Sequence, residues 1–370
     1  MARRSNRRDF LRGRLAADTA ADAIERAADG PASAESPGDA GPRPYVVQVA
    51  RDAMACEFEV RLRAGQYAHG TEAALEALDL VGHLEDQISV FRESSEISRI
   101  NRTAADRPVE VEPRLFGLVE LALQLHRETA GAFDITSTPL WRLWGFARRE
   151  GRVPEPRQID RVRQNVGSHL LELDGSRRTI RFRRPGVEIG LGSIGKGYAI
   201  DRCAESLSAA GIDEVLIHGG ASSVLATGSP NGAAPDPEGH APALDGWEVG
   251  IPHPLRPGRR LAVLRLRDRA LATSGGKFQS FLRRGKRYGH ILDPRTGWPA
   301  EGLLLATAIA PTAALADALA TAFYVMGTEK VAEMCRMRPE LAAVLVCESR
   351  RGGGIAVETF GLQEGSLTLL

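Results

Sequence analysis

The sequence reads GHILDPRTG over residues 289–297 and ADALAT over residues 316–321, and these two segments carry its most specific chemistry. The first places His290 beside an Asp-Pro-x-x-Gly turn that ends a predicted strand. The second places Asp317 and Thr321 four positions apart, so both side-chain oxygens share one face of an alanine-rich helix. A carboxylate on such an apolar helix needs a charged partner or a bound cation. Two hard oxygen donors on adjacent turns favour Mg²⁺ over zinc.

The bulk composition is typical of a globular protein and argues against several function classes. The chain has 370 residues, of which 43% are hydrophobic and 26% charged, enough for one large domain or two lobes. A net charge of +1 and an aromatic content of 5% argue against nucleic-acid partners. No apolar run is long enough to span a membrane. The four cysteines lack Cys-x-x-Cys spacing, which argues against a zinc site of that type and a dense disulfide framework.

The N-terminal segment, residues 1–43, is rich in Ala, Asp, Arg, Gly and Pro, which predicts a largely disordered basic tail. Within it, RRDFLR at residues 7–12 resembles a twin-arginine export motif. An export signal also needs an apolar stretch, and charged side chains interrupt residues 15–28. The sequence therefore favours a cytoplasmic location, with export as the alternative.

Hydrophobic spacing predicts both helices and strands along residues 44–350, which we treat as one domain. Thr312 and Gly327 are typical start and stop residues for its last predicted helix. Residues 229–246, rich in Pro, Gly and Asp, predict a surface insertion, and residues 351–370 form a C-terminal segment. The predicted helices are 71–88, 113–131, 196–210 and the one that begins at 312; strands are predicted at 45–49, 56–62, within 170–187, and at 215–218, 247–251, 260–266 and 287–292.

The glycine-rich segment GLGSIG at residues 190–195 matches the dinucleotide-binding pattern G-x-G-x-x-G. It follows a predicted strand at 187–189 and opens a helix, which is the context of a βαβ unit. Such a unit also needs an acid at the end of the next strand, but that strand ends with His218 and two glycines. The turn, with Lys196 beside it, favours instead a phosphate site at a helix N-terminus. A tight turn chosen for close packing is the alternative.

Further motifs precede the two opening segments in a fixed order. Together with those segments they resemble the FAD:protein FMN transferases, the ApbE family, over roughly residues 45–350, and an ordered set is more specific than any single pattern. The motifs are MAC (54–56), SVF (89–91), SEISRIN (95–101), AFDIT (132–136), LWGF (143–146), GSIGKGYAID (192–201) and TSG (273–275).

The resemblance implies a fold and an activity. The implied fold is a two-lobed α/β (α+β) structure with mixed, largely antiparallel sheets and a nucleotide cleft between the lobes. The implied activity is Mg²⁺-dependent transfer of FMN from FAD to a threonine hydroxyl of a partner flavoprotein, with release of AMP. The alternative is a non-catalytic flavin- or nucleotide-binding paralogue, or an FAD pyrophosphatase that acts without a protein acceptor.

The resemblance also implies roles for individual residues. His290 is the expected base for the incoming hydroxyl, and Asp317 is expected to act in catalysis through the metal. The expected metal ligands are Ser193, Asp317 and Thr321. The residues expected to line the FAD site are Met54, Phe91, Ala132, Phe133, Asp134, Lys196 and Ser274.

Three positions depart from the family pattern. Many members carry an acid that contacts FAD where Gly190 stands, and glycine has no side chain for that contact. A second family acid, three residues before Asp317, is Ala314 here, which lowers the negative charge available to a metal. Gly276 stands where Asp or Asn often follows the TSG motif. The absence of acids at Gly190 and Ala314 is what the non-catalytic alternative would need.

Overall fold

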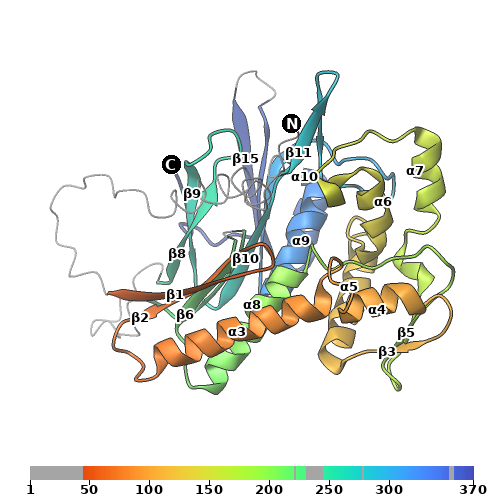
Figure 1. Cartoon of the computed structure of the whole chain (residues 1–370). Helices are drawn as coiled ribbons and strands as arrows, with labels where there is room; N and C mark the ends of the chain where they lie inside the picture. Colours follow the sequence, from red (N-terminus) through yellow and green to blue (C-terminus); the bar gives the residue numbers. More distant parts are fainter. Residues whose placement is uncertain (1–44, 221, 231–244, 277–278, 350–353) are drawn as a thin grey trace, which may run out of the picture.

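The computed structural model describes residues 45–220, 222–230, 245–276, 279–349 and 354–370 (Figure 1). The expected N-terminal tail and most of the expected insertion at 229–246 lie outside the described residues.

An eight-stranded sheet forms the centre of the molecule. Its strands, in spatial order, are β1 (Val46–Ala53), β2 (Cys56–Arg63), β6 (Val215–Gly219), β7 (Ser223–Thr227), β10 (Arg269–Ser274), β13 (Leu303–Ala310), β14 (Ala342–Glu348) and β15 (Ile355–Phe360). Every neighbouring pair is antiparallel. β14 reads AAVLVCE and is buried along most of its length, as expected for a strand covered on both faces. The predicted class, α/β with largely antiparallel sheets, is confirmed.

Three helices cover one face of this sheet (Figure 1). α3 (Gly70–Ile88) packs on β1 and β2, and α9 (Ala313–Met326) packs on β10 and β13. α8 (Gly195–Ala209) lies between them and contacts both helices. The main hydrophobic core fills the space between these helices and the sheet. This packing brings the N-terminal turn of α8 beside the residues of α9 that the sequence singles out.

The opposite face of the sheet carries a second, smaller core. A three-stranded sheet covers it, in the order β16 (Leu367–Leu369), β9 (Arg260–Leu266) and β8 (Trp247–Pro252). α10 (Thr328–Met337) packs against β14 and β15 at the edge of the main sheet. Residues beyond 350 thus add β15 to the eight-stranded sheet and β16 to the three-stranded sheet that covers it.

A smaller part of the chain, toward the right in Figure 1, lies beside the helical layer. Part of it shares the main core, and Leu140 and Trp144 belong to a separate apolar cluster. Its elements are α4 (Glu96–Thr103), β3 (Val109–Glu110), α5 (Pro113–Glu128), α6 (Thr138–Leu143), α7 (Pro156–Arg163), β4 (Leu171–Asp174) and β5 (Thr179–Phe182). A hairpin of β11 (Ser280–Arg283) and β12 (Lys286–Gly289) stands next to this part.

The structure corrects the context of the glycine-rich turn. Residues 187–189 are not a strand, and all strand pairs among the described residues are antiparallel. A Rossmann unit requires a parallel βαβ arrangement, so the dinucleotide-fold interpretation of residues 190–195 is excluded. What remains of the pattern is a turn at the start of α8, as the phosphate-site interpretation expects.

Other predicted boundaries move for local reasons. The helix predicted to reach 131 ends at Glu128, because Ala130 and Gly131 adopt left-handed φ values of 49° and 77°. The predicted strand 287–292 ends at Gly289, and Leu292 makes only an isolated bridge. Within 170–187 only two four-residue strands form. None of the helices in the described ranges is long and apolar enough to cross a membrane.

Candidate functional site

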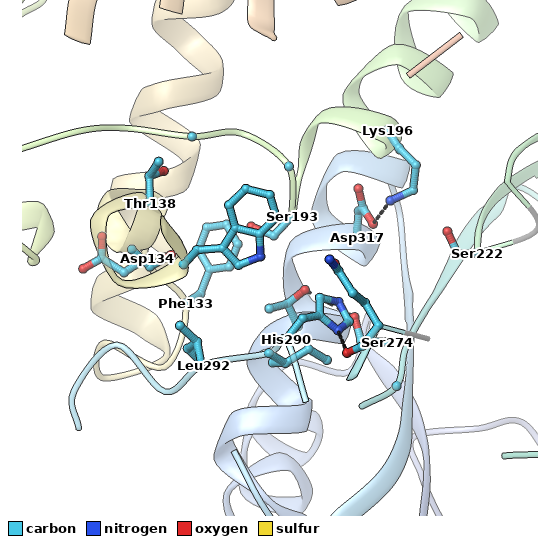
Figure 2. A pocket seen from close by; sticks show the side chains of 18 of the residues that line it. Phe133, Asp134, Thr138, Ser193, Lys196, Ser222, Ser274, His290, Leu292 and Asp317 are labelled. Atoms are coloured by element: carbon cyan, nitrogen blue, oxygen red, sulfur yellow. Dashed lines mark hydrogen bonds and ion pairs between the residues drawn. The ribbon is translucent and has the colours of Figure 1, made fainter. Parts of the chain in front are cut away.

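A cavity of about 570 Å³ lies where α8, α9, the 131–138 turn and the base of the β11–β12 hairpin meet (Figure 2). It brings together nearly all the residues that the sequence analysis selected: Phe91, Ala132, Phe133, Asp134, Ser193, Lys196, Ser274, His290, Asp317 and Thr321. Met54 is not among the described residues that line it; Met54 lies in the β1–β2 turn with φ of 50°, its amide donating to Glu85.

Asp317 lies on α9 with only 7% of its surface exposed, and its carboxylate is already paired. Oδ2 accepts a hydrogen bond from the Gly197 amide at 3.1 Å, and Oδ1 accepts one from the Ser223 hydroxyl at 3.0 Å. The Lys196 ammonium is 3.7 Å from Oδ1 (Figure 2). On an apolar helix, this carboxylate requires either a charged partner or a bound cation. Lys196 is such a charged partner within the chain.

The close approach of α8 and α9 depends on a glycine and on a second carboxylate. A Cβ at Gly197 would lie 2.0 Å from the carbonyl oxygen of Ala313, so only glycine fits there. From α8, Asp201 accepts hydrogen bonds from the amides of Ala313 and Ala314 at 2.7 and 2.8 Å. The two helices are thus joined twice, with Asp317 accepting from the start of α8 and Asp201 accepting from the start of α9. Asp201 belongs to a motif in the sequence, but its role becomes visible only in this packing.

Burial raises the pKa of Asp201 from its ordinary value to about 6, against the lowering effect of its two backbone hydrogen bonds. Asp201 does not line the main cavity; it lines a second hollow of about 500 Å³ that also includes Ala314. Ala314 itself is absent from the described lining of the main cavity. The acid that the family resemblance leads us to expect at position 314 would therefore face this second hollow.

The candidate metal ligands provide one carboxylate and two hydroxyls. Thr321 lies one turn after Asp317 on α9, and its hydroxyl is 3.3 Å from that of Ser274. Ser193 lies in the turn before α8 and lines the same cavity. The described residues contain no group of three or more His, Cys, Asp or Glu side chains that could hold a metal. Hard oxygen donors of this kind fit Mg²⁺, which commonly keeps water and substrate phosphate oxygens as ligands.

His290 follows β12 directly, and one ring nitrogen is fixed by the backbone. Its Nδ1 lies 3.0 Å from the carbonyl oxygen of Gln279, so Nδ1–H is the donor and Nε2 is left unprotonated. Burial lowers the pKa of His290; the Gln279 carbonyl acts in the opposite direction, and the nearby Lys196 charge lowers the pKa further. A neutral imidazole in this tautomer can accept a proton at Nε2.

Asp134 lines the cavity, but its carboxylate is used within the protein. It accepts hydrogen bonds from Thr136 and Ser168, each through both amide and hydroxyl, and pairs with Nδ1 of His126 at 3.0 Å. Burial raises the pKa of Asp134, but hydrogen bonds from His126 and Thr136 outweigh burial and hold the pKa below its ordinary value. In Figure 2 the carboxylate points away from His290 and Asp317. Asp134 therefore fixes the turn that carries Phe133.

Gly190 and Gly276, where the family resemblance leads us to expect acidic or amide side chains, have close packing neighbours. Gly190 lines the cavity, its amide donates to the Ile135 carbonyl at 2.8 Å, and a Cβ there would lie 2.4 Å from the Thr138 hydroxyl. A Cβ at Gly276 would lie 2.3 Å from the Tyr324 hydroxyl. At both positions a neighbouring hydroxyl occupies the space of the missing side chain.

Comparisons with known proteins show the family of this chain. A model of the ApbE family matches residues 54–345. The FAD:protein FMN transferase of Treponema pallidum (strain Nichols) is 31% identical over 300 residues, which cover 79% of this chain and 82% of that protein. The enzyme of the same name from Haemophilus influenzae is 28% identical over 317 residues, covering 83% and 88% of the two chains.

Solved structures share the fold. The ApbE protein of Thermotoga maritima superposes with a TM-score of 0.72 at 28% identity, covering 85% of this chain and 97% of that one. The apo flavinyl transferase ApbE of Pseudomonas stutzeri also gives a TM-score of 0.72 at 28% identity, covering 86% and 95%.

Proposed function

The chain belongs to the ApbE family, and on that premise we propose that it is an FAD:protein FMN transferase. The proposed reaction moves FMN from FAD to a threonine hydroxyl of a partner flavoprotein, releases AMP and requires Mg²⁺. The observation that carries the proposal is the convergence of His290, Lys196, Asp317 and Thr321 on one cavity. These residues come from three separate segments, and together they supply a base, a cation and hard oxygen donors.

The proposed chemistry assigns the proton to His290. The acceptor hydroxyl oxygen attacks the phosphorus of the FMN half, the bond between that phosphorus and the AMP oxygen breaks, and AMP leaves with the electron pair. Nε2 takes the hydroxyl proton, while the Nδ1–H bond to Gln279 holds the ring and its tautomer. The lowered pKa of His290 keeps the imidazole neutral before the reaction.

Phosphate binding in this proposal falls to the start of α8. The positive dipole end of a helix favours anions, and Lys196 adds a full charge beside it. The amides of Gly195 and Gly197 already donate to the Leu191 carbonyl and the Asp317 carboxylate, so charge contributes more here than free amides. Bound Mg²⁺, held by Asp317, Thr321 and Ser193, would neutralise pyrophosphate charge in the transition state. Phe91 and Trp141, whose rings meet edge to face at 6.1 Å, supply an aromatic surface for a planar ring at the other end of the cavity.

One observation favours the competing function, binding or hydrolysis of FAD without transfer. Gly197, Ser223 and Lys196 already occupy the Asp317 carboxylate, so a cation must compete with Lys196 for Oδ1. A water molecule in place of the threonine hydroxyl would give free FMN and AMP.

Mass spectrometry separates these functions. The protein is co-expressed with an acceptor protein, and the two are incubated with FAD and Mg²⁺. The acceptor is then digested and searched for a threonine that carries FMN. Transfer gives one FMN adduct per AMP released, and chelation of Mg²⁺ stops both. Free FMN without an adduct identifies a pyrophosphatase, and unchanged FAD identifies a binding protein. Either result would contradict the proposed transfer.

A further inference from the structure

A basic surface stands beside the cavity and takes no part in the site described above. It consists of six exposed arginines from two adjacent segments: Arg148, Arg149 and Arg152 after α6, and Arg283, Arg284 and Arg287 on the β11–β12 hairpin. We call it the arginine surface. The whole chain has a net charge of +1, so this concentration of one sign is a local feature.

The two segments are held together by aromatic packing. The Phe146 and Phe281 rings lie 5.6 Å apart, and Phe281 stacks on Tyr288 across the hairpin at 5.4 Å. The Gln279 side chain, at the base of the hairpin, donates to the Phe146 carbonyl at 3.2 Å. Arg283 lies on the same face of the hairpin as Phe281 and Tyr288, whereas Arg287 lies on the other face with Leu282, so the arginines surround a packed aromatic base.

The charges of this surface are mostly uncompensated within the described residues. Lys286, also on the hairpin, pairs with Glu301 at 2.8 Å, and Arg287 donates to the Ser280 hydroxyl at 2.9 Å. No ion pair among the described residues involves the other five arginines, although the exposed Glu150 lies in the same segment as three of them. Exposed guanidinium groups without an ion-pair partner can bind carboxylates or phosphates in a bidentate manner, through two parallel hydrogen bonds.

The surface is connected directly to the candidate base. β12 runs from the arginine-rich turn to Gly289, and His290 is the next residue. At about 3.4 Å per strand residue, Arg287 lies about 10 Å and Arg284 about 20 Å along the chain from His290. Leu282, 64% exposed on the same hairpin, adds an apolar contact. A hydroxyl held at His290 would therefore place the neighbouring residues of an acceptor protein within reach of this hairpin.

We infer that the arginine surface docks an acidic segment of the acceptor protein, adjacent to the hydroxyl that receives FMN. This inference rests on the proposed transfer function, and it specifies that the segment of the acceptor protein that docks here is negatively charged. Carboxylates about 10–20 Å from the acceptor hydroxyl would face the guanidinium groups while the hydroxyl enters the cavity. An acidic segment is favoured over a nucleic acid because the aromatic rings beside the arginines are packed on one another and not free to stack on bases.

A binding experiment tests this without relying on turnover. Two labelled peptides carry one Thr each; one has four Glu beginning three residues from the Thr, and the other has Gln in their place. Fluorescence anisotropy measures their affinity for the full chain with FAD. The test variant is Arg148→Gln, Arg283→Gln, Arg284→Asn, in which Asn suits the left-handed φ of 49° at 284. The matched control is Arg177→Gln, Arg178→Asn, Arg181→Gln on the β4–β5 hairpin, where Arg178 also has φ of 49°.

The wild-type chain and the control should bind the acidic peptide about 10-fold more tightly than the neutral one, as expected for several exposed ion pairs. The test variant should lose this preference, and higher salt should weaken it in the wild type. Equal affinity of the wild type for both peptides, or a preference retained by the test variant, would overturn the inference. So would arginine-dependent binding to phosphatidylserine vesicles or duplex DNA in place of the acidic peptide. A missing FMN adduct on the bound peptide would count against the proposed function alone, because the charge preference is measured separately.

Discussion

The cavity has two walls that are built in different ways. One wall is the junction of α8 and α9, where two carboxylates and one glycine hold the helices at close range. The other wall consists of the 131–138 turn and the base of the β11–β12 hairpin, which short polar contacts hold in place. The helical wall sets the positions of charges, and the irregular wall sets the shape and the access of the site. Variants in each wall should therefore fail in different ways.

Asp317→Asn in the helical wall should have the largest effect, the loss of detectable FMN transfer. The amide keeps the shape of the side chain and can still accept from Gly197, but it offers no charge to a cation. Loss of one electrostatic group in a water-excluded site costs roughly 10²–10³-fold in kcat. Asp317 is the only charged group among the candidate metal ligands, so its loss should cost more than loss of a general base, which is roughly 10²–10⁴-fold. The measurement is FMN transfer at saturating FAD over a range of Mg²⁺ concentrations.

Asp201→Asn is the matched control for that variant. Asp201 also accepts backbone hydrogen bonds across the same helix pair, but it does not line the main cavity. It should lower the melting temperature and leave transfer at temperatures below melting nearly unchanged. If the two variants lose activity in proportion to their loss of stability, Asp317 has a structural role and the metal assignment fails.

His290→Asn in the irregular wall should lower kcat by about 10²–10⁴-fold and weaken FAD binding much less. The Asn amide can still donate to the Gln279 carbonyl, so the local backbone is kept, but it cannot accept a proton. A loss of FAD affinity as large as the loss of rate would make His290 a binding residue instead.

The pH dependence gives a second measure of the same residue. The pKa of His290 lies below its ordinary value of 6.5, so the neutral base should persist below that pH. The acid limb of kcat/KM should accordingly fall below pH 6.5. Lys196→Gln removes a charge that lowers this pKa, so the limb should move to higher pH. If the acid limb stays at the same pH in both His290→Asn and Lys196→Gln, then His290 is not the group whose titration produces it.

His126→Ala tests the stability of the irregular wall. The pKa of His126 is raised, so its pairing with Asp134 contributes fully below pH 6.5 and is lost as pH rises through the folded-state pKa. The pKa of Asp134 is lowered, so its contribution is present above 3.8 and is lost as pH falls through the folded-state pKa. The pair should stabilise most between about pH 4 and 6.5.

The His126→Ala variant should therefore lose about 1–3 kcal/mol near pH 5, and the difference from wild type should shrink toward pH 9. Urea unfolding at both pH values measures this. His83→Ala, at an exposed position of α3, is the control and should change stability little at either pH. An equal loss at pH 5 and pH 9 would show that the ion pair contributes nothing and that only packing is lost.

The sequence predicted the helical wall better than the irregular wall, for physical reasons. The spacing of Asp317 and Thr321, the cap at Thr312 and the stop at Gly327 are local signals that survive in α9. The FAD contacts that the resemblance implies for Asp134 and Met54 stay predictions. The partners of the Asp134 carboxylate, His126 and Ser168, lie on other segments, so no local pattern reports them.

Strands buried on both faces were also missed. β7, β13 and β14 carry short apolar runs without alternation, so periodicity does not distinguish them from helix segments. The pairing of Asp201 with the start of α9 joins residues more than a hundred positions apart, and no local pattern reports it.

The smallest effect should come from Gly190→Asp, which places an acid where the family resemblance leads us to expect one. The backbone of Gly190 does not have a left-handed φ, so a side chain is sterically allowed there apart from one neighbour. That neighbour is the Thr138 hydroxyl, 2.4 Å from the position of the new Cβ. Overpacking of this kind costs about 1–3 kcal/mol, so the single variant should be less stable and bind FAD no better than wild type.

Thr138→Ala combined with Gly190→Asp should relieve this clash, because it removes the hydroxyl and keeps the helix start. The double variant should recover the lost stability and bind FAD severalfold more tightly than wild type, since the acid can then accept hydrogen bonds from the nucleotide. Thr138→Ala alone is the control, and the four proteins form a double-mutant cycle with a coupling of about 0.5–3 kcal/mol. If the single and double variants are equally stable, Thr138 does not fill the place of the acid. If the double variant is stable but binds FAD no more tightly, this chain holds FAD through contacts that need no acid at this wall.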